Sequence, residues 1–358
     1  MTERKIRLGF AGTGRIARSV HLAGFQRLAD RVEMVSAFDI DADRVAQAAK
    51  DFGIPHVYTN FEEMLDGPAL DAITICTPPN AHAPLTIQAF ARGLHVLCEK
   101  PAALASADAI EMVRAARRAD RVLMIGFQNR FSRACQALKR IIDDGALGEI
   151  YYARAQSLRR RGLPGWGMFT SKEMSGGGPM MDIGVHALDR MVYLLGNPTP
   201  VTVFGATYQK LATRPGFNAF GPWDPAKVEV EDFATAQVRF ANGATLLLEA
   251  SWMLNISSSA SSTLLCGTEG GAELEPFKVY TEQHGMLFDM ALPDGVWRGP
   301  ESIQTIHDAK LAHFIDCIEQ GSRPIVTPAE IVSVVQILEA VYQSAETGQA
   351  VTIAAPEL

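Results

Sequence analysis

Short apolar runs alternate with longer amphipathic stretches through the first third of the chain. The apolar runs have the length expected of buried strands, and they lie at 6–10, 32–38, 70–76, 95–98 and 121–125. The stretches between them have helical spacing and lie after residue 14 up to about Leu28, at 41–51, at 81–92 and from Ser106 onward. Strands that alternate with helices predict βαβ units, which form a parallel sheet with right-handed crossovers.

The pattern changes after Gly126, where strands begin to follow one another. One helix at 132–143, a strand from Glu149 and a helix at 182–195 come first. Further strands are expected near 201–209, 230–240, 244–253 and 261–266, with Asn242-Gly243 as a hairpin turn. Consecutive strands predict an antiparallel sheet and hence an α+β second domain. We place the first domain at 1–126 and the second at 127–358.

Two helices close the chain. The last begins at Thr327-Pro328-Ala329-Glu330, a capping box with proline at the first helical position, and it ends at Gly348. Neither helix carries a recognisable motif, so both are expected to serve packing and no chemistry.

Composition and charge narrow the functional classes. The chain has 358 residues, enough for two cores, and its net charge of −7 argues against nucleic-acid binding. Arg159-Arg160-Arg161 is too short a basic run to change this. The five cysteines show no metal-ligand spacing, and no apolar stretch reaches the length of a membrane span. No signal segment precedes the first strand, so we expect a soluble, cytoplasmic protein without a metal site.

The turn after the first strand has the spacing of a dinucleotide-binding fingerprint. Gly12 and Gly14 permit a tight turn and close approach of a pyrophosphate to the following helix, with Ala17 at the third position. Asp39 ends the second strand, where an acid bonds the adenosine ribose. Its carboxylate would repel a 2′-phosphate, so NAD is favoured over NADP. Arg44 on the next helix could approach the same position. A plain strand–helix turn is the alternative interpretation.

Glu99-Lys100-Pro101 ends the strand at 95–98. Proline cannot donate to a sheet ladder, so the strand must stop there. Lys100 is therefore expected at the carboxyl edge of the sheet, where parallel sheets bind ligands. A solvated Glu-Lys pair at a strand end is the structural alternative.

A second cluster of candidate residues follows three glycines at 176–178, which we expect to be flexible. Asp182 and His186 stand four residues apart at the start of a helix, so they share one face. That face can be open to a ligand. The alternatives are an Asp182 helix cap with a half-buried His186, or a metal pair, for which no third ligand is present.

These motifs together resemble the Gfo/Idh/MocA oxidoreductases. The resemblance rests on the motifs at 12–17, 77–82, 99–101 and 182–186, which occur in family order and cover essentially the whole chain. It implies a Rossmann domain with a parallel sheet, followed by an α+β domain with a large, mostly antiparallel, open-faced sheet. Members commonly act on sugars, polyols or their keto forms, and many have a cis Lys-Pro bond in the Glu-Lys-Pro motif.

The resemblance also implies roles for individual residues. Lys100, Asp182 and His186 would be catalytic, with His186 as the general acid/base and Asp182 bonding the substrate. The expected cofactor-binding residues are Gly12, Thr13, Gly14, Arg15, Ile16, Ala17, Asp39, Thr77, Pro78, Asn80, His82, Glu99 and Lys100. Gln128 and Asn129 are candidate substrate contacts, and so is Trp166, which could stack on a sugar or could simply anchor its loop.

The implied reaction moves a hydride between nicotinamide and a secondary hydroxyl or keto group of a sugar or polyol. Histidine, with a pKa near 6.5, suits the proton transfer, and a cationic Lys100 would stabilise the developing alkoxide. One alternative is redox-neutral glycoside cleavage by transient oxidation and elimination. A non-catalytic NAD-binding regulator is disfavoured by the intact Lys/Asp/His set.

The second-domain strands also suggest self-association. Residues 244–248 place apolar side chains on both faces of the predicted sheet. The chain's own helices can cover one face, which leaves the other for a partner subunit. Family members often pair through this face. A homodimer or homotetramer is expected.

Overall fold

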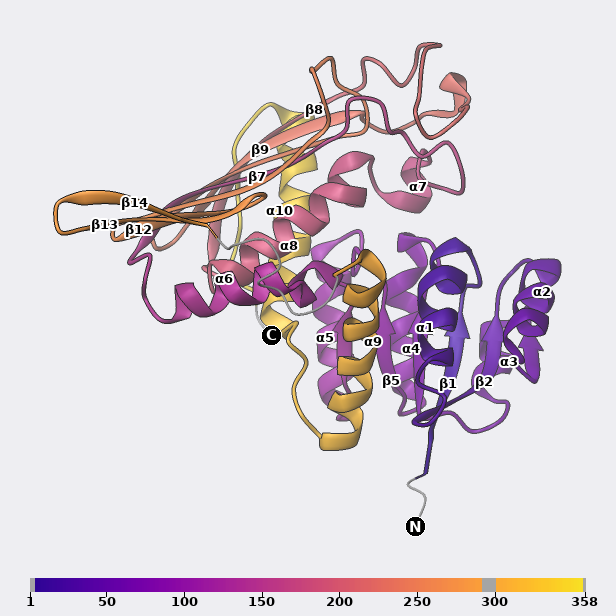
Figure 1. Cartoon of the computed structure of the whole chain (residues 1–358). Helices are drawn as coiled ribbons and strands as arrows, with labels where there is room; N and C mark the ends of the chain where they lie inside the picture. Colours follow the sequence, from indigo (N-terminus) through magenta and orange to yellow (C-terminus); the bar gives the residue numbers. More distant parts are fainter. Residues whose placement is uncertain (1–3, 292–300, 357–358) are drawn as a thin grey trace.

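The computed structural model describes residues 4–291 and 301–356, and its first domain is built on a six-stranded parallel sheet (Figure 1). The strand order is β3-β2-β1-β4-β5-β6. The strands are β1 (Ile6–Ala11), β2 (Val32–Phe38), β3 (His56–Tyr58), β4 (Ala72–Ile75), β5 (His95–Cys98) and β6 (Leu123–Ile125). This confirms the parallel sheet predicted from the alternating pattern. The short β3 was not predicted, because two of its three residues are exposed and it lacks an apolar run.

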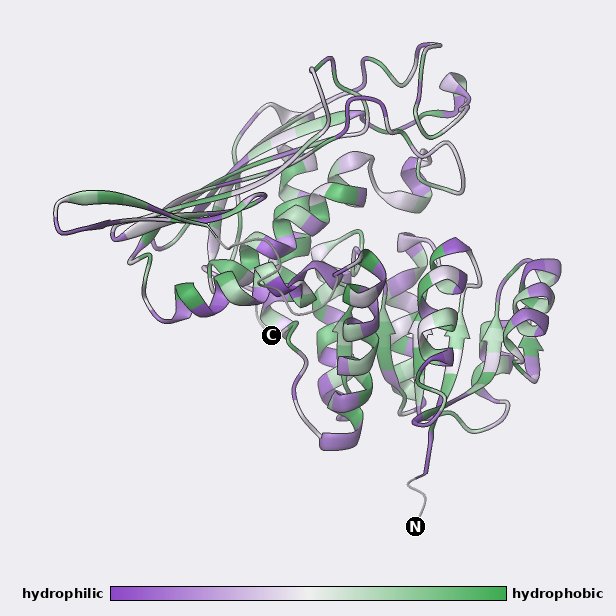
Figure 2. Ribbon diagram, in the orientation of Figure 1, coloured by the Kyte–Doolittle hydropathy of each residue, from purple (hydrophilic) through white to green (hydrophobic). Residues whose placement is uncertain are grey.

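Helices cover both faces of this sheet. They are the π-helical turn η1 (Ala17–Leu22), α1 (Ala23–Gln26), α2 (Ala42–Phe52), α3 (Phe61–Leu65), the 3₁₀ turn η2 (Pro79–Ala81), α4 (His82–Ala91) and α5 (Ser106–Ala119). Figure 2 shows hydrophobic residues along the central strands and hydrophilic ones on the outer side of α2. Strands covered on both faces read as nearly continuous apolar runs, which is why their positions were predictable.

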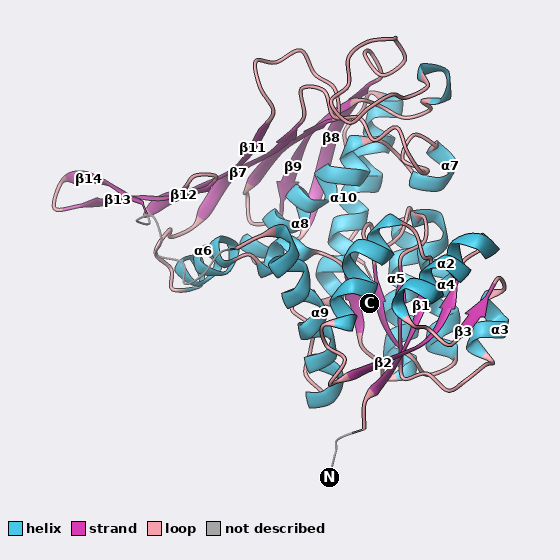
Figure 3. Cartoon of the chain, turned by 45° about the vertical axis from the view of Figure 1, so that its right-hand side comes forward, coloured by secondary structure: helices cyan, strands magenta, loops and turns pink. Residues whose placement is uncertain are grey.

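The second domain has a nine-stranded sheet in the order β14-β13-β12-β11-β7-β10-β9-β8-β15. Its strands are β7 (Ile150–Leu158), β8 (Pro200–Tyr208), β9 (Phe233–Phe240), β10 (Thr245–Ser251), β11 (Ala260–Gly267), β12 (Gly270–Leu274), β13 (Phe277–Gln283), β14 (Met286–Ala291) and β15 (Val351–Thr352). Among these named strands, only β7 and β10 pair in parallel, so the mostly antiparallel prediction is confirmed. Strands β12–β14 were not predicted; they form an arm that extends from one end of the sheet (Figure 3).

Helices lie on one face of this sheet and leave the other open. The domain's helical elements are η3 (Gln128–Phe131), α6 (Arg133–Asp143), α7 (Lys172–Ser175), the π-helical turn η4 (Met180–Gly184), α8 (Val185–Leu194), η5 (Pro225–Lys227) and α10 (Pro328–Thr347). On β10, Leu246 and Leu248 are fully buried on the covered face, whereas Leu247 alternates to the other. On β8 the side chain of Phe204 is 51% exposed. The open face predicted from the sequence is therefore present.

The remaining helix, α9 (Ile303–Gln320), returns to the first domain (Figures 1 and 3). Leu311 and Phe314 join a core cluster with Phe10 and Phe25. Each such fully buried side chain contributes roughly 1.5–3 kcal/mol of transfer free energy. The C-terminal part of the chain thus closes the first domain as well as the second, and the division at residue 126 remains a working proposal.

The segment that crosses between the domains is held by a buried arginine. Arg130 in η3 is fully buried; it donates to Asp189 of α8 at 2.6–3.1 Å and lies 2.9 Å from Glu330 of α10. Its guanidinium also lies over the ring of Tyr193. Removing one partner of such a buried pair leaves an uncompensated charge, so these contacts fix η3 to both helices.

Candidate functional site

The fingerprint turn lies between β1 and η1 at the carboxyl edge of the first sheet. Gly12 has φ +84°, and a Cβ there would come within 2.8 Å of Cys76 and Thr77 backbone atoms. Side chains are therefore excluded at Gly12. At Gly14 a Cβ would meet nothing within 4 Å, so the space above that backbone is open. The crowding at Gly12 requires a residue without a side chain in the tight turn. The free space at Gly14 would allow a pyrophosphate to approach the start of the helix.

Asp39 ties this turn to the end of β2. Its Oδ2 accepts hydrogen bonds from the backbone N and the hydroxyl of Thr13, at 2.8 and 3.0 Å. Its Oδ1 accepts from the Asp41 backbone and from Arg44 at 3.0 Å. The Arg44 side chain, 47% exposed, also pairs with Asp41. Arg44 therefore does lie beside Asp39, as the sequence allowed, and its charge is balanced by the carboxylates of Asp39 and Asp41.

The loop after β4 borders the same edge. The side chain of His82 is buried, with Nδ1 2.7 Å from the Pro101 carbonyl and Nε2 2.9 Å from the Thr77 carbonyl. His82 therefore joins this loop to the Glu-Lys-Pro turn. The Thr77 hydroxyl is buried and has no partner among the described residues, and exposed Asn80 reaches Met174 of α7 at 3.3 Å.

Lys100 and Asp182 meet between the two domains. Lys100 Nζ donates to the carbonyl and to Oδ1 of Asp182, at 2.7 and 3.0 Å, and the Lys100–Pro101 bond is cis. Trp252, which follows β10 and is fully buried, donates from its indole to Asp182 Oδ2 at 3.1 Å. Arg159 lies 3.8 Å from the same oxygen. Burial alone would raise the pKa of Asp182, but Lys100 and Arg159 outweigh it and hold that pKa below its ordinary value.

His186 lies one turn after Asp182, on α8. Asp182 is inside the π-helical turn η4 and caps no helix, since the helical segment already begins at Met180. The imidazole is half-buried, and its Nδ1 is buried without a partner among the described residues. Burial, followed by the charge of Lys100, lowers the pKa of His186 to about 3. The expected value near 6.5 is therefore wrong for this site, and the ring is neutral at neutral pH.

The three glycines before η4 are packed tightly, which corrects the expectation of a flexible loop. A Cβ on Gly177 would come within 2.0 Å of the Tyr342 hydroxyl, and one on Gly178 within 2.1 Å of the Glu231 carbonyl. The buried Glu231 carboxylate accepts from the Gly178 backbone at 2.8 Å and from Tyr342 at 2.8 Å. These glycines are needed because other groups fill their space, and the packing fixes the position of Asp182.

Glu99 points into the protein. Its Oε1 accepts from His21 Nε2 and from Lys310 Nζ, both at 2.8 Å, and all three side chains are buried. His21 lies in η1 and Lys310 in α9. The prediction that the terminal helices carry packing residues alone is therefore incomplete, because α9 supplies a buried cation directly behind the Glu-Lys-Pro turn.

An aromatic pair in the second domain lies against the fingerprint turn of the first. The ring centroids of Trp166 and Phe220 are 5.8 Å apart, and the side chains are 39% and 46% exposed. Arg15 of the fingerprint turn lies 5.1 Å from the Trp166 ring centroid, and Arg159 lies 5.1 Å from that of Phe220. The loop thus lies against the fingerprint turn. Of the other predicted residues, Gln128 is buried and Asn129 half-buried, both in η3.

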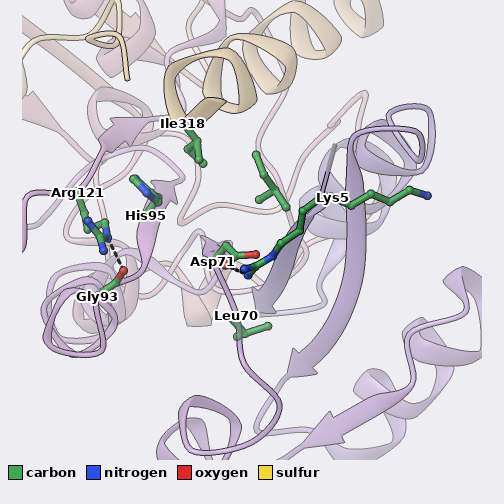
Figure 4. A pocket seen from close by; sticks show the side chains of 9 residues that line it. Lys5, Leu70, Asp71, Gly93, His95, Arg121 and Ile318 are labelled. Atoms are coloured by element: carbon green, nitrogen blue, oxygen red, sulfur yellow. Dashed lines mark hydrogen bonds and ion pairs between the residues drawn. The ribbon is translucent and has the colours of Figure 1, made fainter. Parts of the chain in front are cut away.

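A separate hollow of about 350 Å³ lies at the opposite edge of the first sheet, near the amino ends of β1 and β5 (Figure 4). Its cations already have partners: Arg4 pairs with Asp71, Lys5 with the Ala29 carbonyl and Arg121 with the Gly93 carbonyl. It carries none of the chemistry gathered around Lys100.

Metal-binding clusters and membrane-spanning helices are both absent from the described ranges. Residues 4–291 and 301–356 hold no group of histidine, cysteine or carboxylate side chains arranged to bind a metal ion. Within the same ranges, every helix is too short or too polar to cross a membrane.

Comparison with known proteins matches both halves of the chain. Residues 6–127 match the family described as "Oxidoreductase family, NAD-binding Rossmann fold", and residues 135–273 match "GFO/IDH/MocA C-terminal domain". The D-glucoside 3-dehydrogenase of Escherichia coli is 36% identical over 99% of both chains. The 1,5-anhydro-D-fructose reductase of Ensifer adhaerens is 29% identical over 97% of this chain and 98% of its own.

Solved structures share the whole architecture. A levoglucosan dehydrogenase in complex with NADH and levoglucosan superposes with a TM-score of 0.83, at 23% identity, over 98% of this chain and all of its own. At that identity the likeness shows the fold.

Proposed function

The chain belongs to the Gfo/Idh/MocA family of oxidoreductases and has its NAD-binding Rossmann domain, and we propose that it oxidises the C3 hydroxyl of a D-glucoside with NAD. The observation that carries the proposal is the contact of Lys100 with Asp182, 82 residues apart and from different domains, with His186 one turn further on. This trio lies at the sheet edge that holds the fingerprint turn. Lysine, carboxylate and neutral imidazole are the groups that alcohol oxidation needs.

Lys100, Asp182 and His186 have different charges and would have different roles in the reaction. The Lys100 ammonium stabilises the oxygen as it becomes an alkoxide, and Asp182 accepts a hydrogen bond from a neighbouring hydroxyl and orients Lys100. His186, neutral at neutral pH, takes the hydroxyl proton, and the nearby Asp182 carboxylate stabilises the imidazolium that forms. Gly12 and Gly14 would hold the pyrophosphate of NAD along this turn, and the nicotinamide would supply the hydride acceptor.

The aromatic pair favours a glycoside over a free sugar. Trp166 and Phe220 are partly exposed, and Arg159 lies between Phe220 and Asp182. Apolar rings of this kind stack on a sugar face or an aryl substituent. The 36% identity to a D-glucoside 3-dehydrogenase supports the same substrate class.

A panel of methyl and aryl D-glucosides, free sugars and polyols tests the proposal. NADH formation and aglycone release are followed in the same reactions. We expect NADH to accumulate with glucosides, at lower KM than with free glucose, and a 3-keto glucoside as product. Aglycone release without net NADH would show redox-neutral cleavage, and binding of NAD without turnover on any substrate would show a regulator.

NAD is expected to bind at least about tenfold more tightly than NADP, which corresponds to roughly 1.4 kcal/mol. The reason is that Asp39 and Asp41 surround the position of a 2′-phosphate and neutralise Arg44. Asp39→Ala should reduce the difference between the dissociation constants of NAD and NADP. It should also weaken NAD binding, because Thr13 loses two hydrogen bonds. Calorimetric titration of both cofactors measures this, and equal dissociation constants in the wild type would refute the preference.

We further propose that the protein is a cytoplasmic homodimer or homotetramer that pairs through the open face of the second sheet. Phe204 and Tyr208 of β8 expose 51% and 41% of their surface on that side. Light scattering at micromolar concentration measures the oligomeric state. A monomer would contradict the proposal.

A further inference from the structure

A buried charged cluster lies directly behind the Glu-Lys-Pro turn. Glu99 follows β5 at the sheet edge and is 6% exposed, and Lys310 of α9 and His21 of η1 are completely buried. Both donate to one oxygen of Glu99, at 2.8 Å. The other oxygen accepts a long hydrogen bond, 3.3 Å, from the backbone N of Lys100. One carboxylate therefore connects α9 and η1 to the residue that contacts Asp182.

Gly126 borders the Glu99 carboxylate on a further side. A Cβ on Gly126, at the end of β6, would lie 2.8 and 3.1 Å from the two Glu99 oxygens. The absence of a side chain at Gly126 is thus what makes room for Glu99. Four elements fix the group: β5 carries it, β6 supports it, and η1 and α9 donate to it.

We infer that Lys310 is a positioning residue for the reaction: its ammonium keeps the Glu99 carboxylate charged and in place, and Glu99 in turn fixes the backbone of Lys100. The inference rests on the proposed role of Lys100 at the reacting hydroxyl. Lys310 does not need to contact either the substrate or the cofactor. Its effect passes through Glu99 alone, and this distinguishes it from a catalytic residue.

The charge balance of the cluster supports this role. Burial alone would raise the pKa of Glu99, but Lys310 and His21 outweigh it and hold that pKa well below its usual range. Burial, together with Lys310, lowers the pKa of His21, so His21 does not supply the positive charge of the cluster. Other titratable residues also interact with Glu99 through its charge or a hydrogen bond, namely Cys76, His82, Cys98, Lys100, His186 and His307.

Four variants separate positioning from packing. Lys310→Met removes the charge and keeps much of the side-chain volume, and Lys310→Arg keeps the charge. The double variant Lys310→Met/Glu99→Gln removes both charges. Asp308→Asn is the matched control, because it breaks an ion pair between α9 and Arg27 that does not involve Glu99.

Turnover per folded molecule is measured from acid to neutral pH with the glucoside that yields NADH. Lys310→Met should lower kcat at least tenfold and add an acidic limb to the pH profile of kcat. The reason is that a buried Glu99 without the Lys310 ammonium takes up a proton as pH falls. Lys310→Arg should recover most of the turnover, and Asp308→Asn should match the wild type. The double variant should lack the limb, since the amide that replaces the Glu99 carboxylate does not titrate, and should be no slower than Lys310→Met.

Melting temperatures provide a readout that does not depend on the proposed substrate. In Lys310→Met we expect the pKa of folded Glu99 to be raised, so the contribution of Glu99 to stability is present at low pH and is lost as pH rises through that pKa. The difference in melting temperature between Lys310→Met and the wild type should therefore grow as pH rises. The wild type should show no such loss, because its Glu99 pKa is lowered. Wild-type kcat with an unchanged pH profile in Lys310→Met would overturn the inference, and so would an acidic limb that persists in the double variant. If no glucoside is oxidised, the proposed function fails, and the melting profiles alone decide whether Lys310 holds Glu99 charged.

Discussion

Replacing His186 by alanine is expected to lower turnover by roughly 10²–10⁴, the usual contribution of a positioned general base. The imidazole follows the Lys100–Asp182 contact by one helical turn, and its pKa responds to both charges. No other histidine has this relation to Asp182 in the part of the chain that the structure describes. NAD affinity should survive, because His186 belongs to α8 and the fingerprint turn belongs to the first domain.

The pH dependence of the wild type belongs to the same prediction. Since burial lowers the pKa of His186 to about 3, the free base is already present throughout the neutral range. Protonation of His186 should therefore produce no acidic limb near pH 6.5, and loss of the base is expected only as pH falls toward about 3. A kcat/KM profile with a His186-dependent limb near 6.5 would contradict this.

The control for His186→Ala is His56→Ala, a change at an exposed histidine on the edge strand β3. It should leave turnover unchanged. Melting temperatures are recorded on the same preparations. If His186 is only a packing residue, its loss lowers stability while the remaining folded protein keeps wild-type turnover, and that result would end the catalytic assignment.

Lys100→Met should cost at least as much turnover as His186→Ala. Lys100 donates to both the carbonyl and the carboxylate of Asp182, and its removal takes away a cation at the developing alkoxide. Loss of one donor to such a charge typically costs about 10²–10³ in kcat, and the loss of the positive charge itself adds to this. The fold should persist, because Trp252 and Arg159 still face the Asp182 carboxylate.

Lys227→Met provides the comparison for Lys100→Met, because Lys227 of η5 is 80% exposed and lies 3.8 Å from Asp224, its nearest charged partner among the described residues. Its turnover and melting temperature should equal those of the wild type. Steady-state kinetics with the best glucoside measures both variants. A Lys100→Met enzyme within tenfold of the wild type would remove Lys100 from the mechanism.

The sequence predicted most of the fold because buried strands leave a strong apolar signal. The runs at β1, β2, β4, β5 and β6 matched the parallel sheet, and Asn242-Gly243 marked the hairpin between β9 and β10. The arm formed by β12–β14 was missed. Every residue of β14 is exposed, so it has no period-2 burial pattern to detect.

The candidate site was predictable only where residues belong to compact motifs. Lys100, Asp182 and His186 were singled out in this way, and Lys100 contacts Asp182 in the structure, while the catalytic roles of the three stay predictions. Trp252 and Lys310 were missed because each is a single residue outside any motif, and tertiary contacts alone bring them to Asp182 and Glu99. The pKa of His186 was misjudged for a related reason: burial decides it, and burial of one histidine cannot be read from local sequence.

Transfer of deuterium from a glucoside labelled at carbon 3 tests the central claim most directly. The protein is incubated with NAD and the labelled glucoside, and the reduced cofactor is analysed by mass spectrometry. We predict that the deuterium moves to the nicotinamide ring and that a 3-keto glucoside accumulates in equal amount. Reduced cofactor without the label, or no reduction despite bound NAD, would contradict the assignment of this site to oxidation at carbon 3.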